Sequence, residues 1–164
     1  MAAKEKNLED LFHETLKDIY FAEKKILVAL PKMAKAALSD DLRTAFEKHT
    51  EETEGQVERL EQVFEIIGKP ARGKTCPAIE GLVEEGKEVM KDFKESDALD
   101  PGLLAGAQAV EHYEISRYGT LVAWAEQLGM DDAAKLLKQT LDEEKKTDVT
   151  LTKLAESSLN RMAA

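Results

Sequence analysis

Hydrophobic residues recur three and four positions apart along most of the chain, which is the spacing of one face of a helix. Alternating patterns typical of strands are nearly absent. We therefore expect an all-α protein whose helices are separated by turn-forming residues. The expected helices cover residues 7 or 8 to 38, 41–67, 78–94, 101–128, and 131 or 132 to 158.

Local signals mark where several of these helices begin and end. The residues Ser-Asp-Asp at 39–41 predict a stop followed by a new N-cap, and Gly68 predicts the residue just after a helix end. Asp100 and Pro101 predict the N-cap and the first position of the next long helix.

The lengths of the connections predict the arrangement of the four long helices. Short turns join the first pair and the last pair, so each pair is expected to be antiparallel. A connection of ~30 residues, which holds the short helix, lets the third long helix run parallel to the second. We predict a ferritin-like, up-down-down-up four-helix bundle with a short extra helix in the crossover, forming one domain over residues 1–164.

Each long helix interrupts its hydrophobic stripe with polar residues near its middle. In an antiparallel bundle these middle positions meet at one level, so we expect a buried polar layer. Its candidate members, which we also take as candidate metal ligands, are Glu23, His49, Glu52, Glu111, Glu114, Glu144 and Asp148.

Several carboxylates in one core cannot all stay ionised without a compensating charge. No Lys or Arg lies on the inward stripes at this level, so protons or metal cations must supply that charge. Carboxylates and an imidazole from four facing helices suit two divalent ions, iron or alternatively manganese.

Each candidate also has a purely structural interpretation. A single Glu on a stripe commonly reaches solvent at the edge of the core, and His49 alone is more commonly a core histidine than a ligand. Glu144 lies in a charged run, Leu-Asp-Glu-Glu-Lys-Lys, that is typical of an exposed face. Four helices that break their stripes at the same level favour the metal interpretation. His112 does not share the face of Glu111 and Glu114, so we expect it outside the site.

Charge and composition exclude several classes of function. The chain has 33 acidic and 23 basic residues and a net charge of −10, which argues against a nucleic-acid partner. Its charged residues and the lack of a long apolar run predict no membrane span, and the absence of a signal-like N-terminus predicts a cytoplasmic protein. Cys76, the single cysteine, excludes an internal disulfide. It is expected to be an incidental loop residue, and the alternative is a reactive thiol.

Four segments of the chain resemble the YciE/YciF-type bacterial stress proteins, which are ferritin-like and related to rubrerythrins. They are LFHETLKDIYFAEKKIL, FEKHTEETEGQVERLEQVFE, AQAVEHYEISRYGTLVAWAEQLG and AAKLLKQTLDEEKKTDVTLTKLA. The resemblance implies a four-helix bundle that forms a homodimer. In the rubrerythrin pattern Glu23, Glu111 and Glu114 match metal ligands. The chain departs from that pattern at two positions. The rubrerythrin pattern has a His three residues after a Glu, and this chain has Gly55 and Thr147 there.

These observations lead to two hypotheses about function. The first is a di-metal protein of a bacterial stress response that reacts with peroxide or O₂ if it is catalytic. The second is a non-catalytic helical scaffold or partner-binding dimer with a vestigial metal site. A DNA-protecting role is disfavoured by the net charge of −10.

Overall fold

The computed structural model describes residues 5–164, which are helical over most of their length and contain no strand. The predicted all-α class is therefore confirmed. The helices are α1 (Leu8–Ala36), α2 (Asp40–Ile66), α3 (Pro77–Asp92), α4 (Leu99–Gln127), α5 (Asp131–Leu154), a π-helical turn η1 (Ala155–Leu159) and α6 (Asn160–Met162).

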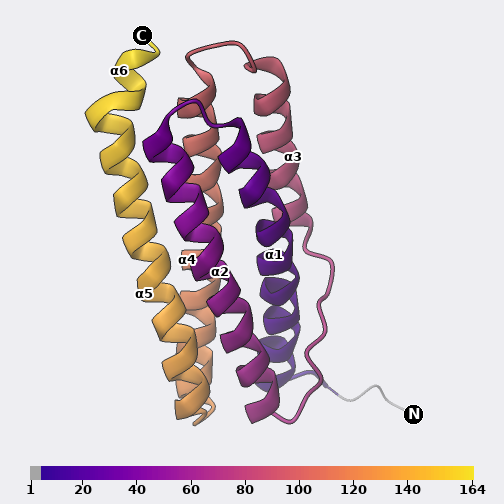
Figure 1. The fold of residues 1–164 in the computed structure, drawn as a ribbon. Helices are drawn as coiled ribbons and strands as arrows, with labels where there is room; N and C mark the ends of the chain where they lie inside the picture. The colour runs from indigo at the N-terminus through magenta and orange to yellow at the C-terminus, as the bar shows by residue number, and fades with distance from the viewer. Residues whose placement is uncertain (1–4) are drawn as a thin grey trace.

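Four long helices, α1, α2, α4 and α5, lie side by side as a bundle (Figure 1). In the view of Figure 1, α1 and α5 run upward and α2 and α4 run downward, so the predicted up-down-down-up order is confirmed. The crossover between α2 and α4 climbs the outside of the bundle and contains α3, which packs against α1 and α4.

Hydrophobic side chains fill the bundle at both ends. At the end where α1 begins, the core includes Phe12, Leu16, Phe64, Leu121 and Leu137; at the other end it includes Leu30, Phe46, Leu104 and Leu151. Burying each of these side chains contributes ~1.5–3 kcal/mol of transfer free energy. The two apolar regions enclose a middle level that contains the buried polar residues.

Two of the expected helix ends are confirmed. Ser39 is the N-cap of α2, where its side chain accepts a hydrogen bond from the backbone N–H of Leu42 at 3.4 Å. Gly68 follows α2 with a φ of 66°, a left-handed conformation that favours glycine because it has no Cβ.

The predicted N-cap role of Asp100 is wrong. α4 begins at Leu99, two residues before the predicted start at Pro101, and the Asp100 carboxylate is buried in its first turn. That carboxylate accepts hydrogen bonds from the backbone N–H groups of Leu38 and Ser39, at 2.8 and 2.7 Å. Asp100 therefore joins the start of α4 to the turn between α1 and α2, which is a contact between distant segments that no local pattern indicates.

Cys76 was expected to be an incidental loop residue, and this expectation is also wrong. Its side chain is buried and forms the N-cap of α3, with Sγ accepting from the backbone N–H of Ile79 at 3.4 Å. Its Sγ also lies 3.0 Å from the hydroxyl of Tyr113 on α4. The residue thus anchors the beginning of the crossover helix to the bundle.

In the described part of the chain, no helix combines the length and the hydropathy that crossing a bilayer requires.

Replacing Asp100 by Ala is expected to lower the free energy of unfolding by about 1–3 kcal/mol, because the two hydrogen bonds that the buried carboxylate accepts from backbone N–H groups are lost. Urea unfolding followed by circular dichroism would measure this loss. The matched control is Asp97→Ala, at an exposed position three residues earlier, which should change the stability by less than about 0.5 kcal/mol. Equal effects of the two substitutions would show that the Asp100 contact does not hold the turn.

Candidate metal centre

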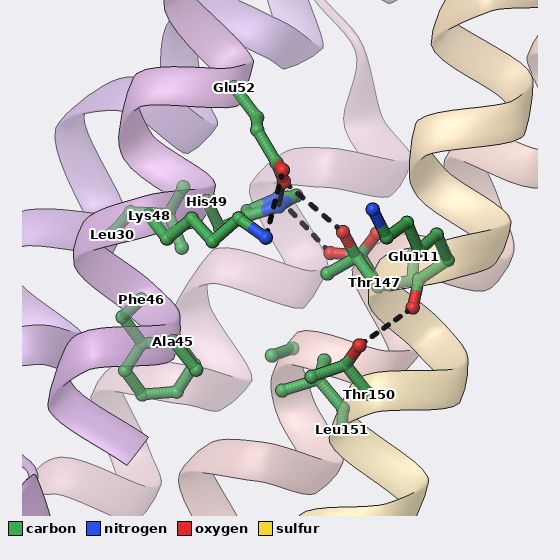
Figure 2. A pocket seen from close by; sticks show the side chains of 12 residues that line it. Leu30, Ala45, Phe46, Lys48, His49, Glu52, Glu111, Thr147, Thr150 and Leu151 are labelled. Atoms are coloured by element: carbon green, nitrogen blue, oxygen red, sulfur yellow. Dashed lines mark hydrogen bonds and ion pairs between the residues drawn. The ribbon is translucent and has the colours of Figure 1, made fainter. Parts of the chain in front are cut away.

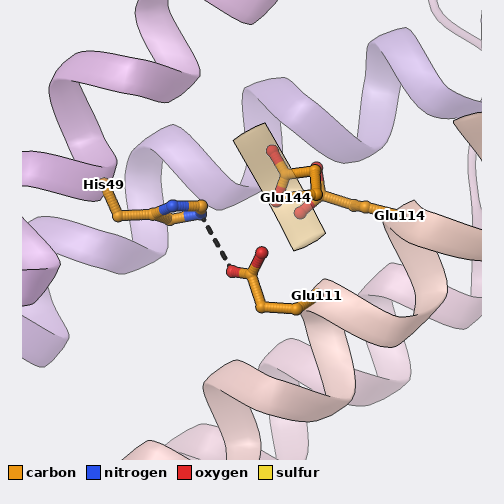
Figure 3. Close-up of side chains that lie close together, drawn as sticks. All are labelled: His49, Glu111, Glu114 and Glu144. Carbon is orange, nitrogen blue, oxygen red and sulfur yellow. Dashed lines mark ion pairs between the residues drawn. The ribbon is translucent and has the colours of Figure 1, made fainter. Parts of the chain in front are cut away.

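Four side chains from three helices come together at the middle level of the bundle. They are His49 on α2, Glu111 and Glu114 on α4, and Glu144 on α5, and we call them the central cluster. Each offers one ligand atom, and these atoms all lie within 4.8 Å of one another (Figure 3). None of the four residues is more than 4% exposed. Carboxylate oxygens and an imidazole nitrogen at this spacing can surround one metal ion.

Helical periodicity explains why the cluster residues point inward. Glu111 and Glu114 are three residues apart, and Tyr118 follows four residues later, so all three lie on the buried face of α4. His49 lies three residues after the core residue Phe46 on the same face of α2. The polar residues therefore occupy positions that hydrophobic residues occupy elsewhere on these helices.

Glu23 reaches the same level from α1 and is completely buried. One of its oxygens accepts a hydrogen bond from the hydroxyl of Tyr118. Burial, assisted by the negative charge of Glu144, raises the pKa of Glu23 to about 8. Glu23 thus belongs to the polar layer, to which α1 contributes as well as α2, α4 and α5.

Glu52 lies at the edge of the layer. Its carboxylate is 3.9 Å from Nδ1 of His49 and 3.6 Å from the Lys48 ammonium, and it accepts a hydrogen bond of 3.4 Å from Thr147 (Figure 2). Its side chain is 27% exposed, in contrast to the cluster residues. A role of Glu52 as a ligand stays a prediction.

Asp148 is not brought into the central cluster. One of its oxygens lies 3.0 Å from Nε2 of His112 and accepts a hydrogen bond of 3.2 Å from Gln108. The ring of His112 is exposed, as expected from its position off the face of Glu111 and Glu114. Asp148 therefore contacts groups on the outer side of α4, and its role as a ligand also stays a prediction.

Two residues of α2 near the layer were not among the candidates. Gln56 is buried and its amide donates hydrogen bonds to Glu144 and, at 3.3 Å, to Glu143. Arg59 donates to Thr140 at 2.9 Å and pairs with Glu143 at 2.7 Å. No Lys or Arg was expected on the inward stripes at this level, but the long Arg59 side chain reaches the edge of the layer from a partly buried position. The sequence pattern places Gln56 on the same polar stripe as His49, seven residues earlier, although it does not make Gln56 a ligand.

The carboxylates of the layer are short of hydrogen-bond donors. Among the described residues, five of their buried oxygens have no hydrogen-bond partner: Oε2 of Glu23, Oε2 of Glu111, both oxygens of Glu114 and Oε2 of Glu144. Burial raises the pKa values of Glu111 and Glu114 well above their usual range, and the negative charge of Glu144 adds to the effect. Without a cation the layer therefore retains protons, and a bound cation would displace them. Buried carboxylate oxygens that lack partners are the groups that a metal ion requires.

A cavity of about 40 Å³ lies beside the cluster, and its lining includes residues of α2 and α5 (Figure 2). His49 and Glu111 lie on its wall, together with Glu52 and Thr147. One water molecule needs ~10–15 Å³, so this cavity has room for a few molecules of that size.

Comparison with known proteins places the sequence and the fold of this chain in a known family. A family model described as a domain of unknown function, DUF892, matches residues 7–164. Protein YciF of Escherichia coli (strain K12) is 48% identical over 159 residues, which cover 96% of each chain. The crystal structure of the E. coli stress protein YciF has a TM-score of 0.90 and covers 95% of this chain and 99% of that one.

Two further solved structures share the architecture. YcfI from Rhodopseudomonas palustris is 46% identical with a TM-score of 0.88, covering 93% of this chain and 97% of that one. A protein from Xanthomonas campestris is 21% identical with a TM-score of 0.74, covering 95% and 96% of the two chains, and it shares the fold alone.

The metal-free chain is expected to lose stability as the pH rises from about 4.5 to about 8. In the unfolded chain Glu23 ionises near its ordinary pKa of 4.5, whereas in the folded chain it keeps its proton up to about 8. The folded state thus binds more protons in this window, so a rise in pH favours unfolding. Melting temperatures measured in a chelating buffer at several pH values would show the decline.

Glu23→Gln should reduce this decline in melting temperature, because the glutamine amide does not ionise in this pH range. The exposed substitution Glu85→Gln should leave it unchanged. A decline of equal steepness in Glu23→Gln and the unsubstituted chain would contradict the prediction.

Proposed function

The chain belongs to the DUF892 family, and from this membership and its buried centre we propose that it is a ferritin-like, metal-binding protein of a bacterial stress response. The observation that carries the proposal is the central cluster, with its four ligand atoms within 4.8 Å and its carboxylate oxygens without partners. The E. coli relative is described as a stress protein, which supports the same role here.

The donor set fits two divalent ions, as the sequence predicts. Four fully buried carboxylates, those of Glu23, Glu111, Glu114 and Glu144, carry four negative charges when ionised, equal to the charge of two divalent cations. His49 adds a neutral nitrogen ligand without changing that balance. The central cluster would hold one ion, and Glu23 together with Glu114 and Glu144 would hold the second. Oxygen-rich sites with one imidazole suit Fe²⁺ or Mn²⁺.

Bound iron would supply redox chemistry, in which two Fe²⁺ give two electrons to hydrogen peroxide, and two protons complete its conversion to two molecules of water. The protein's own residues prepare this chemistry. Apolar side chains above and below the layer exclude bulk water, and the cavity of about 40 Å³ beside His49 has room for a molecule as small as peroxide. Tyr118 and the carboxyl of Glu23 form a hydrogen-bonded pair that can hold a proton next to the site.

We further propose that the protein acts in the cytoplasm as a homodimer and forms a single domain over residues 1–164. These proposals follow from the sequence and from its resemblance to the YciE/YciF type. The alternative is a scaffold or partner-binding role with a vestigial site, which agrees with YcfI of R. palustris, whose description proposes a structural role.

Metal binding is tested by two histidine substitutions. The chain purified without chelator is expected to contain about two ions, and adding Fe²⁺ under anaerobic conditions to the metal-free chain should raise its melting temperature. His49→Ala should abolish most of the rise, because it removes a cluster ligand 3.1 Å from Glu111. His112→Ala, which removes an exposed histidine, should keep it.

A metal-free preparation whose melting temperature ignores both Fe²⁺ and Mn²⁺ would favour the scaffold alternative. Equal behaviour of His49→Ala and His112→Ala would show that the ion binds outside the central cluster.

The second ion is tested by Glu23→Gln, which should lower the iron content from about two ions to about one. Because peroxide needs two electrons, the same variant should also oxidise Fe²⁺ at least about tenfold more slowly after mixing with hydrogen peroxide. Stopped-flow absorbance of Fe³⁺ and elemental analysis give the two measurements, with Glu85→Gln as the control. Two ions in Glu23→Gln would remove Glu23 from the site.

A further inference from the structure

A second and larger cavity opens between α1, α3 and α4, and its lining includes His49 and Glu111 of the central cluster. Its volume is about 230 Å³, and its wall is mostly hydrophobic, with Ile26 from α1, Leu82, Val83 and Met90 from α3, and Val110 from α4. A buried apolar cavity of ~150 Å³ holds one benzene molecule, so this one has room for about nine non-hydrogen atoms.

Two helical glycines create part of this space. Gly86 on α3 and Gly106 on α4 both line the cavity, and a Cβ added to either would meet no atom within 4 Å. A glycine inside a helix costs ~1 kcal/mol relative to alanine. At Gly102, in contrast, a Cβ would lie 2.7 Å from Val89, so that glycine is needed for close packing of α3 on α4. Gly86 and Gly106 have no such packing role, and they leave the cavity open.

Charges divide the cavity into two ends. Lys25, Lys32 and Lys87 line it and are exposed, whereas His49 and Glu111 line it and are buried. Lys25 lies 3.8 Å from Glu80 and Lys87 lies 2.9 Å from Glu84, and neither of these acids lines the cavity. The outer end therefore offers ammonium groups, and the inner end offers the edge of an acidic layer.

We propose that this cavity binds an amphiphilic carboxylate with an unbranched hydrocarbon tail of about eight carbons. The tail lies along the apolar wall and points toward His49 and Glu111, whose buried position would make it costly for a carboxylate to lose its water there. The carboxylate stays at the outer end, where the lysines attract it. This binding needs no metal ion, so it stands or falls independently of the proposed metal chemistry.

Calorimetric titration of the metal-free full-length chain with butanoate, hexanoate and octanoate tests the proposal. The affinity is expected to rise about fourfold for each methylene that enters the cavity, which corresponds to ~0.8 kcal/mol. Octanol and octyltrimethylammonium, which match the tail but lack the negative charge, should bind at least about fivefold more weakly than octanoate. Affinity that does not depend on tail length, or equal binding of octyltrimethylammonium, would overturn the proposal.

Substitutions at two glycines of α4 locate the binding. Gly106→Leu places a side chain in the cavity and should reduce octanoate affinity at least about tenfold, while circular dichroism confirms that the helices remain. Gly119→Leu is the matched control, because its Cβ also meets no atom within 4 Å but it does not line the cavity, and it should bind octanoate normally. Unchanged binding by Gly106→Leu would show that octanoate binds elsewhere.

The charged end is tested by Lys32→Gln, which should weaken octanoate severalfold and leave octanol unchanged. Lys135→Gln on α5, far from the cavity wall, serves as its control. A loss of octanol binding equal to the loss of octanoate binding would contradict the assigned role of the lysines.

Discussion

The cost of burying four carboxylates at one level of a helical bundle is the constraint on which the rest of this structure depends. An isolated ionised carboxylate is strongly disfavoured in an apolar interior, and here Glu23, Glu111, Glu114 and Glu144 come from three different helices to share one layer. Protons relieve the cost when no cation is present, which is why burial raises the pKa values of three of these groups. A bound cation relieves it more completely, because one ion interacts with several oxygens at once. Hydrophobic side chains at both ends of the bundle shield this layer from bulk water. Protons or metal ions must therefore compensate the negative charge of its carboxylates.

Much of this arrangement could be predicted from the sequence, because the apolar residues and the buried polar residues both follow the periodicity of a helix. The spacing of apolar residues predicted the helices, and the short turns and the long crossover predicted their directions. The same periodicity, broken at Glu23, His49, Glu111 and Glu144, predicted which polar residues would face inward. Residues on one stripe of a helix share a face whatever the neighbouring helices are, so this part needed no knowledge of tertiary contacts.

The remaining features depend on contacts between segments distant in sequence. Glu52 and Asp148 satisfy the same spacing rules as the cluster residues, but each lies at an edge where Lys48, Thr147 or His112 can reach it. The guanidinium of Arg59 reaches from α2 to α5 because its side chain is long, whereas helical periodicity predicts only the face from which a side chain starts. The structural roles of Asp100 and Cys76 could not be predicted for a similar reason, since Asp100 bonds to Leu38 and Ser39 and Cys76 contacts Tyr113 of α4.

The contact of Asp100 has a consequence for the distant centre. The cluster takes His49 from the hairpin of α1 and α2, and its three carboxylates from the hairpin of α4 and α5. Sliding one hairpin along the other by a single helical turn would move its side chains by ~5.4 Å, which exceeds the 4.8 Å within which the ligand atoms lie. By binding the backbone of Leu38 and Ser39, Asp100 fixes the axial register of the two hairpins at one end of the bundle. A carboxylate several turns away from the central cluster thus holds two hairpins in the axial alignment that brings four side chains from three helices together.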